Sequence, residues 1–251
     1  SLIKADIGHI QLRAKMRMKF MLILWPHGGK IMSSIKNISA SNPVPNDLAK
    51  RLGNDGIGVI LATLWLGYKD LYATGMVRAD TDEDTITVEW YLKVYNRWTS
   101  ENRASQVNVN LIPTNQYPDV TVKKKRGKAP TIDFCFRAWN RDEGYFGAEC
   151  KRLKSNNAKL LQEYVDNGLM RFVNGKYSLM CSESAMIGYI QEGTIKDIVD
   201  KLKVLLSTNT RLEEQLLREV REESPQYKSA HSRSIDNKTI TVHHLFFDFV
   251  V

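Results

Sequence analysis

Two apolar runs separated by a short turn-forming stretch constrain most strongly what this chain can fold into. Residues 131–139 and 145–153 alternate between two faces, as side chains do along a strand that packs on a core. Residues 140–144, between them, have the composition of a turn. We therefore expect an antiparallel β-hairpin, the most economical connection between two such strands.

The alternation gives each strand one apolar face and one face with charged side chains. On the first strand Asp133 lies on the face opposite to Ile132, and on the second Glu149 and Lys151 share one face. If Trp139 pairs with Tyr145 at the turn, Cys135 falls opposite Glu149, and Asp133 falls opposite Lys151. Asp133 and Glu149 are then diagonal neighbours, with side-chain origins about 5.5–8 Å apart. Because a slip of one residue would bury the aspartate, the faces are better determined than the register.

Asp133, Glu149 and Lys151 form a combination suited to phosphodiester hydrolysis. Two carboxylates can hold a hard divalent cation, which neutralises a phosphate and acidifies a bound water molecule. A lysine beside them can orient the attacking water or stabilise the charge that builds on phosphorus. The alternative is a solvated cross-strand ion pair, since about one Glu-x-Lys string is expected by chance in a chain of this length.

Residues 130–133 (Pro-Thr-Ile-Asp) and 145–153 (Tyr-Phe-Gly-Ala-Glu-Cys-Lys-Arg-Leu) resemble the motif of the PD-(D/E)XK nuclease superfamily. This resemblance implies the restriction-endonuclease-like fold, whose core is a helix, a three-stranded antiparallel meander, a crossover helix and a fourth strand. It also implies that Asp133 and Glu149 bind Mg²⁺, with Mn²⁺ as a substitute, and that Lys151 serves the nucleophilic water.

The family's Pro-Asp dipeptide is interrupted in this chain. Two residues separate Pro130 from Asp133, whereas a literal Pro118-Asp119 stands earlier. The residues before Asp119 are rich in Pro, Asn and Gln and show no strand pattern. We therefore assign the first carboxylate to Asp133.

A third acidic residue is expected on the helix that precedes the meander. Residues 82–98 predict this helix, with a capping signature from Thr81 to Asp84. Its apolar stripe repeats every four residues: Ile86, Trp90, Val94 and Trp98. Glu83 falls near the middle of the stripe and is the candidate for a third catalytic carboxylate. The alternative is an ordinary first-turn acid that complements the helix dipole.

The remaining patterns predict an α/β (α+β) chain, with helices flanking a central mixed sheet. Apolar periodicity and capping residues predict helices over 45–73, 157–173, 193–206 and 210–222. Strands are predicted over 177–190 and 239–251, and 224–238 is a polar stretch. We expect 43–251 to be a single restriction-endonuclease-like domain with a helical N-terminal part, and 1–42 to be a partly ordered N-terminal extension.

A basic cluster just before the first strand of the hairpin predicts contact with a polyanion. The chain has a net charge of +8. Six residues near the motif are candidates for gripping DNA phosphates: Lys123, Lys124, Lys125, Arg126, Lys128 and Arg152. A solvated loop is the alternative for the cluster.

Other residue types indicate the compartment and exclude some classes of protein. Cys135, Cys150 and Cys181 lie in apolar runs without metal-ligand spacing, which indicates reduced core thiols and a cytoplasmic protein. No window reaches the roughly 18 uninterrupted apolar residues of a membrane span, so no membrane partner is expected. His243 and His244 lack the partner residues of a His-metal nuclease and are interpreted as strand residues.

These expectations converge on a Mg²⁺-dependent endonuclease that hydrolyses DNA phosphodiester bonds. A restriction or defence setting follows from family analogy alone. A homodimer is expected, because cutting both strands usually needs two sites. The alternative is a catalytically inactive nucleic-acid-binding or scaffolding subunit with the same fold. The presence of all three active-site residue types favours the nuclease, since an inactive scaffold has no reason to keep a costly cluster of acids.

Overall fold

The computed structural model describes residues 46–119, 129–139, 144–208, 217–219 and 226–250. Several predicted features therefore lie outside the described residues: the extension 1–42, the basic residues Lys123, Lys124, Lys125 and Arg126, the neighbouring Lys128, and most of the helix predicted over 210–222. The remaining features can be compared with the structure directly.

Seven strands within the described residues form one mixed sheet in the order β1-β2-β3-β4-β7-β6-β5. Their bounds are β1 Leu111–Pro118, β2 Thr131–Ala138, β3 Tyr145–Lys154, β4 Glu183–Glu192, β5 Leu217–Glu219, β6 Gln226–Ser232 and β7 Thr239–Asp248. The first three strands form an antiparallel meander, whereas β3, β4 and β7 run parallel to one another. The predicted hairpin of two charged strands is thus confirmed as β2 and β3.

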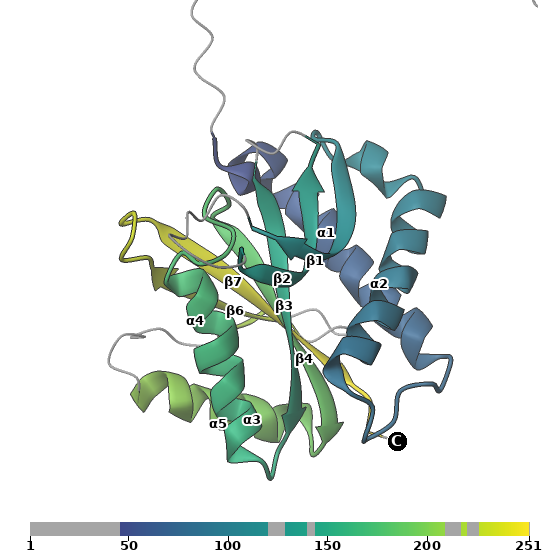
Figure 1. Cartoon of the computed structure of the whole chain (residues 1–251), viewed down its shortest axis with the longest axis vertical. Helices are drawn as coiled ribbons and strands as arrows, with labels where there is room; N and C mark the ends of the chain where they lie inside the picture. The colour runs from purple at the N-terminus through teal and green to yellow at the C-terminus, as the bar shows by residue number, and fades with distance from the viewer. Residues whose placement is uncertain (1–45, 120–128, 140–143, 209–216, 220–225, 251) are drawn as a thin grey trace, which may run out of the picture. The chain divides into compact units, whose positions relative to one another are not determined.

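Helices cover both faces of this sheet (Figure 1). Two of them, α1 (Leu48–Tyr72) and α2 (Glu83–Ser100), pack on one face, and a short 3₁₀ helix η1 (Arg103–Gln106) follows them. The other face carries the crossover from β3 to β4, which comprises α3 (Ala158–Glu163), a π-helical turn η3 (Tyr164–Leu169) and α4 (Met170–Val173), together with α5 (Ile195–Thr208). The prediction of an α+β chain with a mixed sheet flanked by helices is therefore confirmed.

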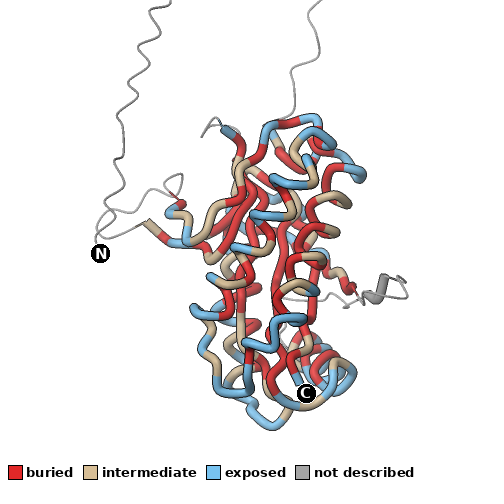
Figure 2. Tube along the Cα trace, turned by 90° about the vertical axis from the view of Figure 1, so that its right-hand side faces the viewer, coloured by how far each residue is buried: buried red, intermediate tan, exposed pale blue. Residues whose placement is uncertain are grey.

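The strands lie between two separate apolar cores. One core joins the sheet to α1 and α2, and the other joins it to the crossover helices and α5. Figure 2 shows the consequence, since the segments in the middle of the view are largely buried while exposed residues lie on the flanking helices. None of the helices within the described residues is long and apolar enough to span a bilayer.

The start and orientation of α2 follow from its sequence. Its N-cap is Asp82, whose carboxylate accepts hydrogen bonds from the backbone N–H and the hydroxyl of Thr85. The capping signature predicted from Thr81 was therefore wrong by one residue. The predicted apolar stripe is buried, and the indole of Trp90 donates to the Leu64 carbonyl of α1 at 3.1 Å. These contacts fix the helix with its first turn directed at β3.

Two strands, β1 and β6, show no clear strand pattern in the sequence. The edge strand β1 is only half buried and contains Pro113 and Pro118, which weaken its alternation but are tolerated at a sheet edge. The second, β6, lies in the stretch interpreted only as polar, and it has no strand pattern because several of its inward side chains are polar. Gln226 and Ser229 are buried and bond to ring nitrogens of β7 histidines, so polarity did not indicate exposure.

Two further predictions need correction. The strand predicted from residue 177 begins only at Glu183, because 177–182 form turns instead. The helix predicted over 210–222 is contradicted at Leu217–Glu219, which pair antiparallel with β6 as β5. The helices predicted over 45–73, 157–173 and 193–206, and the strand over 239–251, are confirmed within a few residues at their ends.

Candidate functional site

The strands β2 and β3 separate at Asp133. Their backbone pairing runs from Arg137–Tyr145 to Phe134–Ala148. At the next position, the carboxylate of Asp133 accepts the backbone N–H of Cys150 at 2.8 Å. A side chain thus takes the place that a backbone carbonyl would hold in a regular ladder, and it reaches β3 beside the predicted catalytic residues.

The register of this hairpin differs from the predicted one by two residues. Cys135 pairs with Gly147 rather than with Glu149, and Tyr145 pairs with Arg137 rather than with Trp139. A shift of two residues leaves the faces unchanged, so Glu149 and Lys151 keep the predicted side. Ile132 is an exception, since it packs in the core opposite to that of Phe134.

The irregularity of β2 is centred on Asp133. On the β1 side the ladder contains Asn115–Phe134 and Tyr117–Ile132, while Gln116 and Asp133 between them are not paired. Gln116 has a φ of 46°, a conformation that residues other than glycine rarely adopt. Local distortion of this kind concentrates at functional sites, where it directs a side chain away from the regular pleat.

Glu149 is the buried acid of the cluster, with an exposed fraction of 0 %. Its Oε1 lies 3.2 Å from Lys151 Nζ and 2.6 Å from Arg171 Nη1. Its Oε2 is buried and has no hydrogen-bond partner. Burial, reinforced by the charge of Asp133, raises the pKa of Glu149 to about 7. The alternative of a solvated ion pair between Glu149 and Lys151 is therefore excluded.

Lys151 stands at the centre of the acids. Its Nζ lies 3.0 Å from Glu83 Oε1 and 3.8 Å from Asp133 Oδ2, in addition to its contact with Glu149. Burial favours the neutral amine, but these three carboxylates outweigh it and raise the pKa of Lys151 above its usual value. Burial also raises the pKa of Asp133. Lys151 is therefore a charged donor that holds three acids together.

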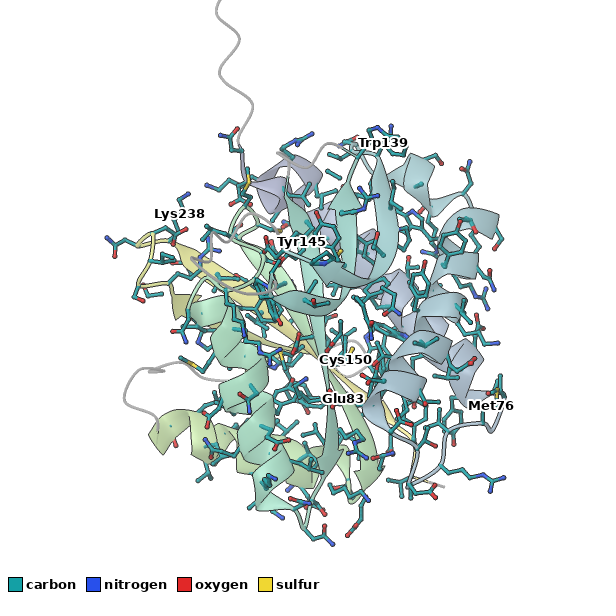
Figure 3. All side chains as sticks on the ribbon, viewed as in Figure 1. Met76, Glu83, Trp139, Tyr145, Cys150 and Lys238 are labelled. Carbon is teal, nitrogen blue, oxygen red and sulfur yellow. The ribbon has the colours of Figure 1, made fainter. Side chains whose placement is uncertain are left out.

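Glu83 joins the cluster from the first turn of α2. One carboxylate oxygen contacts Lys151, and the other accepts the backbone N–H of Arg152 at 2.9 Å. Figure 3 shows Glu83 next to Cys150, where α2 approaches β3. The side chain thus turns inward to β3, and the structure brings together all four residues predicted to be catalytic: Glu83, Asp133, Glu149 and Lys151.

The donor chemistry of the cluster suits a divalent cation. Three carboxylates within reach of one ammonium group are the hard oxygen ligands that Mg²⁺ prefers, and the buried Oε2 of Glu149 lacks a partner. Within the described residues, however, no group of three or more His, Cys, Asp or Glu side chains is arranged so that it could hold a metal ion. In this structure all three acids contact Lys151 instead, and Glu149 also contacts Arg171.

Sequence reasoning missed Arg171 and Tyr177. Arg171 Nη1 also donates to the hydroxyl of Tyr177 at 2.8 Å, and this hydroxyl donates to the Thr131 carbonyl at 2.6 Å. Burial and the nearby charge of Glu149 raise the pKa of Tyr177 to about 12, which keeps its proton available for that bond. No spacing in the sequence relates these residues to the motif, because their meeting depends on how the crossover helix docks.

The crossover helix passes directly over the site. A side chain added at Gly168 would place a Cβ 2.4 Å from Cε of Met186 and 3.6 Å from Cγ of Lys151. A Cβ here would push the end of the Met186 side chain aside, so the absence of a side chain favours the close approach of the helical backbone to β3 and β4. This approach brings Arg171, one turn later, to Glu149.

The other sequence candidates lie elsewhere. Asp119 does follow a strand, contrary to the sequence argument, but it is buried and accepts a hydrogen bond from the Tyr145 hydroxyl at 2.5 Å. Arg152 is partly exposed next to the cluster, while the other five predicted DNA-binding residues lie outside the described residues. The assignment of DNA contacts to these six residues stays a prediction.

The cysteines and histidines have structural environments. All three cysteines are buried and free, as predicted. His243 and His244 are buried in β7, where the first contacts Glu183 at 2.6 Å and the second contacts the Tyr164 hydroxyl at 2.8 Å. Both are therefore strand residues with hydrogen-bond partners, as the sequence indicated.

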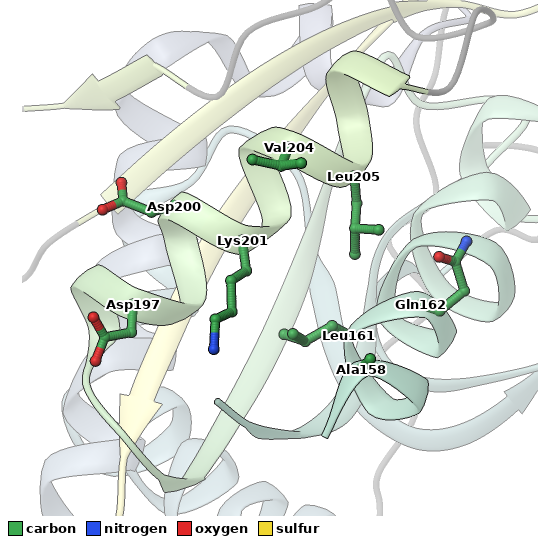
Figure 4. A pocket seen from close by; sticks show the side chains of 8 residues that line it. All are labelled: Ala158, Leu161, Gln162, Asp197, Asp200, Lys201, Val204 and Leu205. Carbon is green, nitrogen blue, oxygen red and sulfur yellow. The ribbon is translucent and has the colours of Figure 1, made fainter. Parts of the chain in front are cut away.

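An apolar groove lies between α3 and α5, away from the acidic cluster. Figure 4 shows Leu161, Val204 and Leu205 along it, with Asp197 and Asp200 at one side. None of the predicted catalytic residues lines this groove. The chemistry of the chain is therefore concentrated at the strand separation rather than in this hollow.

Comparison of the chain with protein-family models, curated proteins and solved structures gave no match.

Proposed function

We propose that this protein is a Mg²⁺-dependent endonuclease of the PD-(D/E)XK, restriction-endonuclease-like class that hydrolyses DNA phosphodiester bonds. The observation that carries the proposal is the meeting of Asp133, Glu149 and Lys151 where β2 and β3 separate, with Glu83 beside them. The order of elements, a helix followed by an antiparallel meander, a helical crossover and a parallel strand, supports the fold class.

Access to the cluster supports action on an extended phosphodiester chain. Glu149 is fully buried, whereas Asp133 and Glu83 are 26 % and 29 % exposed and Arg171 is 29 % exposed. A phosphate can thus approach from the side of the two exposed acids and Arg171. Arg152 lies next to this opening along β3, and the basic cluster before β2 is the proposed continuation of the phosphate track.

The residues of the cluster have different roles in the proposed hydrolysis. Asp133 and Glu149, with Glu83 in support, would hold Mg²⁺, for which Mn²⁺ is the proposed substitute. When bound, the ion neutralises phosphate charge and lowers the pKa of a water molecule. Lys151 keeps its proton and donates hydrogen bonds, so its role is to orient the water and to stabilise negative charge on the phosphoryl oxygens.

Cleavage of a supercoiled plasmid tests the proposal. In the presence of Mg²⁺ the parent protein is expected to nick the plasmid, and Lys151→Ala to lower the rate by about 100-fold or more. Lys159→Ala is the matched control, because Lys159 is 84 % exposed and forms only a surface ion pair with Glu163. Absence of Mg²⁺-dependent cleavage by the parent protein would refute the proposed activity. Cleavage of both strands would further support the proposed homodimer.

A second function is supported by one specific observation. The acids are already compensated by Lys151 and Arg171, and they form no metal-holding arrangement among the residues that the structure describes. This closed network suits a catalytically inactive nucleic-acid-binding or scaffolding subunit. DNA binding without cleavage, at any concentration of Mg²⁺ or Mn²⁺, would favour this second function.

A further inference from the structure

One chain of hydrogen bonds ties the crossover helix to both acid-bearing strands. Arg171, on α4, donates from Nη1 to Oε1 of Glu149 on β3 at 2.6 Å. The same nitrogen donates to the hydroxyl of Tyr177, which in turn donates to the carbonyl of Thr131 at the start of β2. Thr131 lies two residues before Asp133. The chain therefore links the two strands that carry the motif acids.

The two oxygens of Glu149 have unequal surroundings because of this arrangement. Oε1 receives both cationic groups, Lys151 Nζ and Arg171 Nη1. Oε2 is equally buried but receives no hydrogen bond. A buried carboxylate oxygen without a partner is costly, since it has lost its hydration without replacement. The presence of this unpartnered oxygen is explained if a ligand binds to it.

Arg171 is itself held in place. Its guanidinium lies over the ring of Tyr177, with Cζ 5.5 Å from the ring centroid, in addition to its bond with the hydroxyl. A planar guanidinium fixed by a second residue can set the rotation of the carboxylate it binds, which a mobile surface arginine could not do. The geometry is that of an orienting residue behind a metal ligand.

We propose that Arg171, anchored by Tyr177, is a positioning residue that takes Oε1 of Glu149 and thereby leaves Oε2 to bind the divalent cation. This inference rests on the proposed function, because it assigns a role toward the same cation. It also gives the two basic residues of the cluster different roles. Lys151 acts on the reacting groups directly, whereas Arg171 acts through Glu149.

The competing role for Arg171 predicts the opposite change. If Arg171 only balanced charge, its removal would leave the acids more negative and would tighten cation binding. If it positions Glu149, removal frees the carboxylate to turn and weakens cation binding. Loss of an orienting partner behind a metal ligand typically weakens affinity by about 10-fold to 100-fold. The sign of the change therefore distinguishes the two roles without any measurement of activity.

Calorimetric titration with Mg²⁺ alone and with Mn²⁺ alone provides the test. Arg171→Gln is expected to bind each ion at least about 10-fold more weakly than the parent protein. Arg171→Lys keeps the charge but replaces the planar guanidinium, which is held by the Tyr177 hydroxyl and ring, with an ammonium group on a flexible stem, so it is expected to bind more weakly as well. The matched control is Arg97→Gln, which should leave ion affinity unchanged. It removes an α2 arginine that is paired with Asp70 of α1 and with Glu101, the C-cap residue of α2.

Tyr177→Phe keeps the proposal testable if the arginine variants fail to fold. It removes the hydroxyl that anchors Arg171 but leaves the aromatic ring under the guanidinium and all the charges. It is expected to weaken ion binding in the same direction, by a smaller factor. Circular dichroism and thermal unfolding in a chelator identify the variants that are folded.

Each outcome has one meaning. A parent protein that binds neither ion refutes the proposed function itself. A parent protein that binds, together with folded Arg171 and Tyr177 variants that bind equally well or more tightly, refutes only the positioning role. Weaker binding by both sets of variants, with Arg97→Gln unchanged, supports it.

Discussion

Asp133 and Cys150 are joined across the hairpin by a hydrogen bond from the Cys150 backbone N–H to the Asp133 carboxylate, at 2.8 Å. The bond replaces one rung of the β2–β3 ladder, whose last backbone pair is Phe134–Ala148. An acid that occupies a backbone site is held more rigidly than one on a flexible stem, because the strand itself fixes its partner. The candidate site is thus part of the sheet rather than an attachment to it.

Glu149 is expected to make the stability of the metal-free protein depend on pH. Its pKa is about 7 in the folded protein, above the ordinary value of 4.5, so the folded state retains a proton that the unfolded chain releases. This contribution is fully present below pH 4.5 and is lost as pH rises through 7. Urea unfolding in a chelator should show a loss of about 3 kcal/mol attributable to this group, and Glu149→Gln should remove it. Equal pH dependence in the parent protein and the variant would contradict the assignment.

Lys151→Ala is expected to destabilise the metal-free protein by about 3 kcal/mol. The substitution leaves three acids, Glu83, Asp133 and Glu149, without their shared ammonium group, and Glu149 is fully buried. Mg²⁺ should restore much of the loss, because a cation supplies the missing positive charge. Urea unfolding with and without Mg²⁺ measures both effects, and a variant as stable as the parent protein in a chelator would show that the cluster is not coupled to the fold.

Gln116→Gly is expected to stabilise the protein by about 1 kcal/mol. Gln116 has a φ of 46°, and glycine adopts this conformation without the strain of a side chain. The side chain is exposed, so little packing is lost. Gln162→Gly, at an exposed position of α3, is the matched control and should destabilise by about 1 kcal/mol. Thermal unfolding of both variants gives the comparison, in which shifts of the same sign would argue against strain at Gln116.

Gly67→Ala is expected to destabilise the protein by about 2 kcal/mol and to reduce activity. A Cβ at Gly67 would lie 2.4 Å from Cγ2 of Val94 and 3.1 Å from its backbone nitrogen, so α2 would have to move away from α1. This movement would displace Glu83 at the start of α2. Gly58→Ala, elsewhere on α1, meets nothing within 4 Å and should stabilise slightly. Denaturant titration and plasmid nicking of the two variants provide the measurement.

The sequence predicted those parts of the site that depend on strand alternation and helical periodicity. Glu149 and Lys151 share a face because alternation along β3 is fixed by its apolar partners, and Glu83 points to β3 because it continues the stripe that contains Trp90. The register could not be predicted, because it depends on the length of a loop whose ends are set by packing. For the same reason Arg171 was missed, since no local pattern encodes which strand a helix crosses.

The polar strand β6 shows a different limit. Hydrophobic patterning treats Ser229 and His231 as solvent-facing, yet both are buried beside His244 and bond through the Ser229 hydroxyl. Buried polar side chains find their hydrogen-bond partners only when the strands of the sheet have come together. A strand with polar inward side chains can therefore be recognised only when the strand it pairs with is known.

The π-helical turn η3 determines the angular position of Arg171. Residues 164–169 lie between two α-helical segments, and a π-turn inserts one residue relative to an α-helix, which rotates everything that follows by about 100°. If the same residues wound as a regular α-helix, the arginine would lie on another side of the helix. The winding of η3 therefore decides which side of the helix Arg171 occupies, and with it which strand the guanidinium reaches.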